Sequence, residues 1–283
     1  MSGHASLYFS PMQILDARRV LSADKRGSSW PVLVETDAGV RFTKLRGAAQ
    51  GTGALVAEVI VAELAETLGL LVPARSLVRF PSELESLDEN DELADLLRAS
   101  AGINLGFAYL DGARNFSPQS DVDRVRQEVA AAILWLDGLT TNPDRTARNP
   151  NLLWWREELW LIDHGAALGF QYALPDVAPD AARRPYTLRE PHLLRTRVAD
   201  LGDWDDRFAA RTGRETIERA VMTVPDEFLE PLVRDGSLAE RRESYVEFLW
   251  QRLAAPRPFL EPVLVQGNQR PSRGRPAWLD RPR

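Results

Sequence analysis

A polar stretch that runs directly into an apolar hairpin constrains this chain more than any other feature. Within residues 142–151, six side chains carry amide, carboxylate or guanidinium groups: Asn142, Asp144, Arg145, Arg148, Asn149 and Asn151. The next two runs, 151–155 and 158–162, are rich in aromatic and aliphatic residues and flank the charged pair Arg156-Glu157, which predicts a β-hairpin. The second run ends at Asp163-His164-Gly165. We therefore expect the rest of the chain to be organised around this loop and hairpin.

The order of polar residues in this stretch is typical of a phosphotransferase active site. Asp144 is followed five residues later by Asn149, and Asp163 comes after the hairpin. In such sites the first Asp faces the acceptor hydroxyl, while the Asn and the second Asp hold Mg²⁺ against the nucleotide phosphates. Mg²⁺ prefers oxygen ligands and keeps several waters, so one Asp and one Asn suffice. Taken alone, Asp144 and Asn149 could equally be turn residues, because Asn-Pro-Asp and Arg-Asn-Pro form turns for local reasons.

Upstream, a second hairpin is predicted by the β-prone runs 32–36 and 40–45, which are joined by Asp37-Ala38-Gly39. Lys44 lies near the end of its second strand. Residues 13–21 before it could be a strand or a short helix, and their pattern does not decide.

A helix follows this hairpin, because apolar residues recur at helical spacing from Leu55 to Leu68, with Gly69 as a stop. Glu58 lies in its first turns. A strand-end lysine is by default solvated and a helix glutamate is usually a surface residue. The combination of Lys44 and Glu58 with the downstream Asp and Asn residues is what favours a site. More helices are predicted at 122–136, 204–212, 214–222, 226–234 and 238–253.

Composition excludes several other kinds of site. The 283 residues include no cysteine, which excludes disulfides, thiolate nucleophiles and cysteine zinc sites, and three histidines are too few for a His-rich metal site. A net charge of -6 argues against direct nucleic-acid binding, which needs a basic footprint. The chain has neither a signal-peptide pattern at its start nor an apolar run of about 18 residues. We therefore expect a cytoplasmic protein without a membrane span.

Five motifs together resemble the HipA-like kinases, a bacterial branch of the fold shared by protein kinases and phosphatidylinositol kinases. They are K-x-x-G-x-x-Q-G at Lys44–Gly51, L-x-x-E at Leu55–Glu58, L-G-L-x-V-P at Leu68–Pro73, N-x-D-R-x-x-R-N-P-N-L-L at Asn142–Leu153 and L-x-x-I-D-H-G at Leu159–Gly165. The resemblance rests on their order and spacing and covers roughly residues 41–170.

This resemblance implies an α+β, bilobal, protein-kinase-like fold. Residues 10–105 would form a β-rich N-lobe with one helix, and residues 106–255 a helical C-lobe with the catalytic loop and metal-binding hairpin. Nucleotide would sit between the lobes. Residues 256–283, rich in Pro and Arg, would form a mobile tail.

The resemblance also implies roles for individual residues. Lys44 would contact the α/β-phosphates with Glu58 as its partner, Asp144 would accept the acceptor's proton, and Asn149 with Asp163 would ligate Mg²⁺. The turn at Gly27, Ser28 and Ser29 would cover the phosphates. Arg145 would bind phosphate or neutralise the neighbouring carboxylates, and His164, where many kinases have Phe, would pack without a catalytic role.

The expected activity is ATP- and Mg²⁺-dependent phosphoryl transfer to a hydroxyl of a protein or small-molecule acceptor, whose identity the sequence leaves open. Three alternatives remain open at this stage. A pseudokinase would bind nucleotide without turnover, and a nucleotidyltransferase of the same fold would transfer a whole nucleotide. An interaction protein would bind no nucleotide at all.

Overall fold

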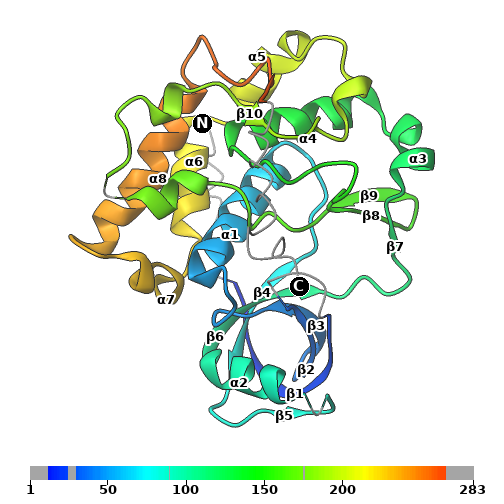
Figure 1. Ribbon diagram of the computed structural model, residues 1–283, viewed down its shortest axis with the longest axis vertical. Coiled ribbons are helices and arrows are strands. Elements are labelled where there is room, and N and C mark those ends of the chain that lie inside the picture. Colours follow the sequence, from blue (N-terminus) through cyan, green and yellow to red (C-terminus); the bar gives the residue numbers. More distant parts are fainter. Residues whose placement is uncertain (1–11, 25–29, 89, 175, 266–283) are drawn as a thin grey trace, which may run out of the picture.

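The computed structural model describes residues 12–24, 30–88, 90–174 and 176–265, and the fold is α+β, as expected. The predicted phosphate-covering turn at residues 27–29 and the tail from residue 266 onward lie outside the described residues. Figure 1 shows a sheet at one end of the molecule, whereas most of the helices lie at the other end.

Five of the six strands in the main sheet close into a ring. The strand order is β2-β3-β6-β4-β1-β5, and an additional pairing between β1 and β2 closes the ring, with β5 outside it. Residues 13–21, for which strand and helix were both open, thus belong mainly to the strand that completes the ring. The strands are β1 (Ile14–Ala23), β2 (Val32–Thr36), β3 (Gly39–Lys44), β4 (Arg75–Phe80), β5 (Glu85–Ser86) and β6 (Gly102–Ala108).

Bulges and a glycine allow this closure. The start of β1 pairs in parallel with β4 and the rest pairs antiparallel with β2, with register shifts after Ala17 and after Val20. Such bulges bend a strand and increase its twist. On β6, Gly106 lies between β3 and β4, and a Cβ there would come within 2.5 Å of Val78 Cγ2. A larger residue at this position would therefore push β4 away from β6.

Two hydrophobic cores are present among the described residues. The smaller one belongs to the strand ring, where helix α2 (Asp91–Ala99) adds Leu93 and Leu97 to side chains from the strands. The larger one surrounds helix α1 (Gly51–Thr67), which contacts α4 (Gln127–Leu139), α6 (Arg214–Met222) and α7 (Asp226–Leu229). Helix α1 is buried at almost every position from Thr52 to Ala65, so it is enclosed on all sides, as expected of a central, mainly apolar helix. In Figure 1 it extends from the sheet into the helical part.

Both predicted hairpins are present, at β2–β3 and at residues 151–162. The hairpin at residues 151–162 consists of β8 (Leu152–Trp155) and β9 (Glu158–Leu161), and β7 (Arg114–Asn115) pairs with β8 to complete a three-stranded sheet. The remaining helices are α3 (Pro118–Asp121), α5 (Gly202–Arg211) and α8 (Leu238–Leu253). Short 3-10 turns lie at Val122–Arg124, Gly169–Ala173, Ala181–Arg183, Arg195–Arg197 and Glu230–Leu232.

Residues 256–265, at the start of the predicted tail, pack on the helical part. Phe259 is fully buried and meets the ring of Trp135 edge-on at 5.4 Å between centroids. Strand β11 (Val263–Leu264) pairs in parallel with β10 (Thr187–Leu188). Packed structure therefore continues past residue 255.

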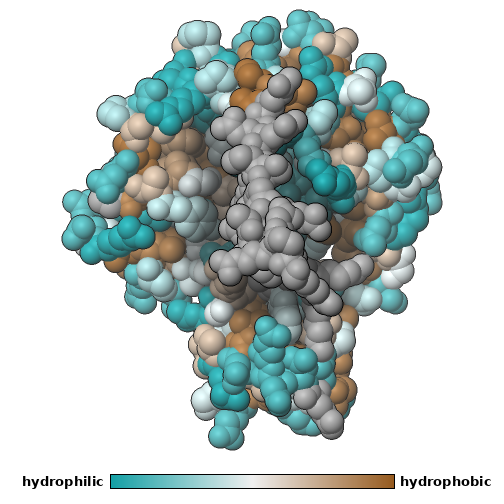
Figure 2. Space-filling model, in the orientation of Figure 1, coloured by the Kyte–Doolittle hydropathy of each residue, from teal (hydrophilic) through white to brown (hydrophobic). Residues whose placement is uncertain are grey.

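The described helices include none that is long and apolar enough to cross a membrane. Figure 2 shows hydrophilic residues over much of the periphery of the face in view, with apolar residues between them.

Candidate active site

A cavity of about 650 Å³ brings together residues from the strand ring and from the β8–β9 hairpin. This volume is typical of small-molecule sites. Its walls are largely apolar, and three charged residues, Asp24, Lys44 and Asp163, also line it. The apolar lining includes Leu33, Phe42, Phe107, Leu153 and Ile162. An apolar cavity with a lysine cation at its wall suits a ligand that has both an apolar part and an anionic part.

Lys44 is held between two carboxylates. Its Nζ lies 2.5 Å from Glu58 Oε1 and 2.6 Å from Asp163 Oδ1, although the three residues come from β3, α1 and the end of the hairpin. Burial alone would lower the pKa of Lys44, but the two carboxylates outweigh it and raise that pKa above its ordinary value. The lysine is therefore a fixed cation at the cavity wall.

Glu58 is completely buried, and its Oε2 has no hydrogen-bond partner among the described residues. Burial raises its pKa even though Lys44 acts in the opposite direction. Gly165 permits the close approach of the hairpin end to α1, because a Cβ there would lie 3.3 Å from both Ala54 Cβ and Glu58 Oε1. The glycine of the Asp-x-Gly motif thus allows α1 to deliver Glu58 to Lys44.

Asp163 is the more accessible of the two carboxylates, with 42% of its side chain exposed. Its backbone is left-handed, with φ 56°, a conformation in which Asp and Asn are enriched among non-glycine residues. Burial would raise the pKa of Asp163, but Lys44 outweighs burial and lowers it. An ionised carboxylate therefore faces the cavity.

The polar loop brings Asp144 to the same place. Asn149 Nδ2 donates to Asp144 Oδ2 at 2.7 Å, and Asn151 Nδ2 lies 3.4 Å from that oxygen and 3.5 Å from the carbonyl oxygen of Asp163. Burial, together with the charge of Asp163, raises the pKa of Asp144. The two aspartates are thus neighbours, although Asp144 itself does not line the cavity.

The residues present fit a magnesium ion of the kind expected. In the part of the chain that the structure describes, no cluster of three or more acidic, His or Cys side chains is arranged for a metal. Mg²⁺ needs no such cluster, because one or two carboxylates, waters and substrate phosphates usually complete its shell. Asp163 offers a partly exposed carboxylate, and Asn149 offers its amide oxygen, since its Nδ2 already bonds Asp144.

Arg145 lies beneath the loop and does not line the cavity. Its side chain is fully buried, and its Nε donates to Asp137 Oδ2 at 2.6 Å. This position suits support of the loop rather than contact with a nucleotide. His164 is also buried, and burial beside Arg145 lowers its pKa to about 3, so it is a neutral, packed residue, as expected.

Asp137 is a residue of this network that was not predicted from the sequence. No motif marks this residue, and the available signal is a single carboxylate in the otherwise apolar run AAAILWLDGL, residues 130–139. It accepts a hydrogen bond from Arg145 and lies 2.9 Å from His192 Nε2, so it joins the loop to a segment much further along the chain.

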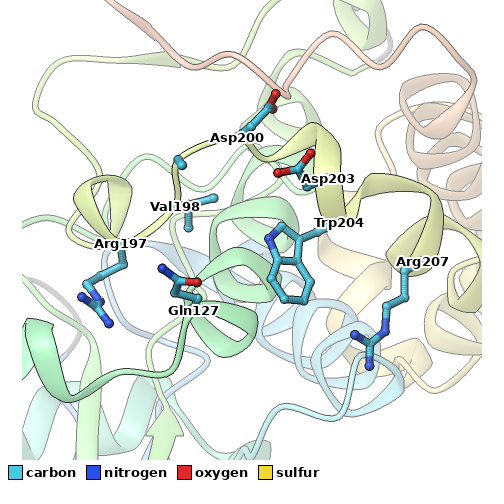
Figure 3. Close-up of a pocket in the computed structure, with 8 residues that line it drawn as sticks. Gln127, Arg197, Val198, Asp200, Asp203, Trp204 and Arg207 are labelled. Atoms are coloured by element: carbon cyan, nitrogen blue, oxygen red, sulfur yellow. The ribbon is translucent and has the colours of Figure 1, made fainter.

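A second cavity, of about 270 Å³, contains none of the predicted site residues. Figure 3 shows it between the start of α4 and α5, with Arg197, Trp204 and Arg207 at its walls. Both arginines are engaged, Arg197 with the carbonyl of Val125 and Arg207 with Glu128. We therefore place the candidate site in the larger cavity.

Residues 18–178, more than half of the chain, match the family model described as HipA-like kinase. Among solved structures, the chain is similar to the Helicobacter pylori proinflammatory kinase CtkA, with 13% identity and a TM-score of 0.47 over 86% of this chain and 98% of that one. The curated proteins contain no match.

Proposed function

Because the chain belongs to the HipA-like kinase family, we propose that it transfers the γ-phosphoryl group of ATP to a hydroxyl group in a Mg²⁺-dependent reaction. The acceptor would be a protein Ser or Thr or a small molecule. One observation carries the proposal. At one wall of the cavity, Lys44 Nζ lies within 2.6 Å of a carboxylate oxygen of Glu58 and of Asp163. Asp144 and its partner Asn149 lie on the adjoining loop.

The arrangement of charge suits a nucleotide triphosphate. Lys44 would bind the phosphates, and Glu58 would keep its ammonium in position. Asp163 and Asn149 would hold Mg²⁺, which when bound supplies positive charge to the phosphates. The apolar part of the cavity would receive the base between the strand ring and the hairpin, which is the bilobal arrangement expected of the family. Phosphoryl transfer needs mainly positioning and charge neutralisation, and these residues provide both.

Asp144 would accept the proton of the acceptor. As the new bond forms between the acceptor oxygen and the γ-phosphorus, the bond from that phosphorus to the bridging oxygen breaks and ADP leaves. The hydroxyl proton passes to the carboxylate of Asp144. The raised pKa of Asp144 favours this role, because a base is most effective when its pKa approaches the working pH.

Thermal unfolding with ATP, Mg²⁺ or both tests nucleotide binding. A ligand that binds only the folded state raises the unfolding temperature by mass action. We expect a rise with ATP and Mg²⁺ together, a smaller rise in D163A, and a wild-type rise in D226A, whose carboxylate makes an exposed pair with Arg242. If millimolar ATP with Mg²⁺ produces no shift in the wild type, the proposal falls.

Labelled ATP separates the remaining alternatives. Incubation with candidate acceptors should transfer label from the γ-position and none from the α-position. Transfer of the α-label would show nucleotidyl transfer instead. Mg²⁺-dependent binding without transfer or ATP hydrolysis would identify a pseudokinase.

A further inference from the structure

Beneath the candidate catalytic loop lies a buried carboxylate that the proposed chemistry does not use. Asp137, on α4, has no exposed surface. It accepts hydrogen bonds from Arg145 Nε at 2.6 Å and from Asn142 Nδ2 at 3.0 Å, and it lies 2.9 Å from His192 Nε2. His192 Nδ1 accepts from the backbone N–H of Leu194, so its proton resides on Nε2 and is donated to Asp137.

Arg145, one of the partners of Asp137, contacts residues close to both candidate metal ligands. Arg145 Nη1 donates to the carbonyl oxygen of Asn151 at 2.7 Å, and Nη2 lies 3.5 Å from His164 Nδ1. Asn151 comes two residues after Asn149, and His164 follows Asp163 directly. The guanidinium of Arg145, which Asp137 orients, therefore contacts a close neighbour of each candidate Mg²⁺ ligand. These neighbours are Asn151, near Asn149, and His164, next to Asp163.

The segment around His192 holds the loop from its other side. Tyr186 donates its hydroxyl to the carbonyl oxygen of Asn142, and the backbone N–H of Leu193 donates to the carbonyl oxygen of Arg145 at 2.9 Å. His192 also forms a β-bridge with Thr146. The loop is thus clamped between α4 and residues 186–193.

This clamp coincides with backbone that needs outside support. Thr141, Asn151 and Asp163 are all left-handed, with φ of 56°, 50° and 56°. This conformation costs free energy for non-glycine residues, which keep it only where their surroundings enforce it. A buried ionic cluster is also weak evidence for stability, since apolar residues of similar volume often stabilise as well or better. Both facts favour a role for Asp137 in fixing geometry.

We propose that Asp137 is a positioning residue which, through Arg145 and His192, sets the placement of Asp144 and Asn149 relative to Asp163. This inference rests on the proposed function, because the geometry it sets is that of the Mg²⁺–nucleotide site. Asp137 itself would touch neither substrate nor metal.

The test compares D137N with D121N. Asp121 is a matched control, because it is equally buried and bound to two arginines, Arg114 and Arg124, but lies outside the loop network. The readout is the affinity for ATP measured with and without Mg²⁺, which needs no turnover. Loss of an outer-shell partner typically weakens metal affinity or activity by about 10–100-fold. D137N should therefore lose about tenfold or more of the Mg²⁺-dependent gain in ATP affinity, whereas D121N should retain it.

His192 provides a second pair of variants if D137N does not fold. H192A removes one donor without leaving the buried guanidinium unpaired and should reduce the Mg²⁺-dependent gain, whereas H192Q, which keeps a donor, should recover part of it. ATP affinity without Mg²⁺ should change little in either variant.

The outcomes separate this inference from the proposed function. If D137N and H192A keep the wild-type gain, or if D121N loses as much as D137N, Asp137 has a merely structural role and the inference is overturned. If the wild type shows no Mg²⁺-dependent ATP affinity, the proposed function fails and the inference fails with it. Where acceptor transfer is measured in the presence of Mg²⁺, D137N should raise KM for ATP about tenfold or more, in parallel with the lost affinity.

Discussion

Among single residues, Lys44 is the one whose loss has the clearest physical consequence. Its ammonium pairs with Glu58, which is fully buried, and with Asp163. K44M would leave the carboxylate of Glu58 buried without a cation, and removal of one partner of a buried pair costs about 3–5 kcal/mol. We expect a loss of this order in the free energy of unfolding, measured by urea denaturation near pH 7.

The same variant should be less impaired in acid. Burial raises the pKa of Glu58, and K44M removes the cation that opposes this rise. A group with a raised folded-state pKa contributes stability below its unfolded pKa, and that contribution is lost as pH rises through the folded pKa. The loss in the free energy of unfolding of K44M should therefore shrink as pH falls from about 7 toward the ordinary Glu pKa of about 4.3.

As a control, R19M breaks an exposed pair with Glu35 and should cost no more than about 1 kcal/mol at either pH. A deficit for K44M that is constant with pH would contradict this account.

The candidate site residues could be predicted from the sequence where their type and spacing form a local pattern. Asp144, Asn149 and Asp163 stand out by type and spacing, and Lys44 by its place at the end of a predicted strand. The structure brings Lys44, Glu58 and Asp163 into contact, whereas their roles in catalysis stay predictions. Asp137 could not be found in this way, because its partner His192 is 55 residues away and belongs to no recognisable motif.

At the scale of single elements, α8 shows how a helix start is fixed by a few atoms. Ser237 caps it: its Oγ accepts from the backbone N–H of Glu240, and the Glu240 side chain accepts in return from the backbone N–H of Ser237. Loss of such a cap costs about 0.5–2 kcal/mol. We expect S237A to lower the free energy of unfolding by this amount in thermal or urea denaturation.

A serine within the same helix provides the comparison. Ser244 is half-buried and donates its hydroxyl to the carbonyl oxygen of Glu240 within the helix, so its loss leaves no helix-end group unpaired. S244A should be neutral or slightly stabilising, because Ala is the better helix former. Similar losses for S237A and S244A would show that the capping box contributes nothing specific.

Elements were predictable where their causes are local. The hairpins at 32–45 and 151–162 follow from β-prone runs and turn residues, and both are present. The closure of the main sheet was not predictable, because β1 pairs with β2, β4 and β5, and no local pattern records which strands will be its partners. For the same reason the pattern at residues 13–21 left strand and helix open.

For the whole molecule, α1 is the element that joins the parts. It lies within residues 10–105, yet its buried side chains pack mainly on α4, α6 and α7. Its largely apolar sequence shows that it is buried, but does not show which elements bury it. The division of the chain into lobes at residue 105 therefore stays a prediction. A nucleotide held at Lys44 and Asp163 would couple the strand ring to the helical part, and α1 is the element through which the two would be coupled.

Acid unfolding of the whole protein should depend measurably on one buried carboxylate outside the site. Asp121 accepts hydrogen bonds from Arg114 at 2.7 Å and from the backbone N–H of Ser117 at 2.8 Å, and the bond to Arg114 holds its pKa well below the ordinary range. A group with a lowered folded-state pKa contributes stability above its unfolded pKa, about 3.9 for Asp, and loses it as pH falls further. D121N should thus be less stable than the wild type by about 1–3 kcal/mol near pH 7. The difference should diminish as pH falls below about 4 in thermal unfolding curves recorded over this range. The exposed Asp123, 3.6 Å from Arg197, gives the control D123N, which should follow the wild type at every pH. If D121N also follows the wild type at pH 7, the pairing with Arg114 does not stabilise the fold.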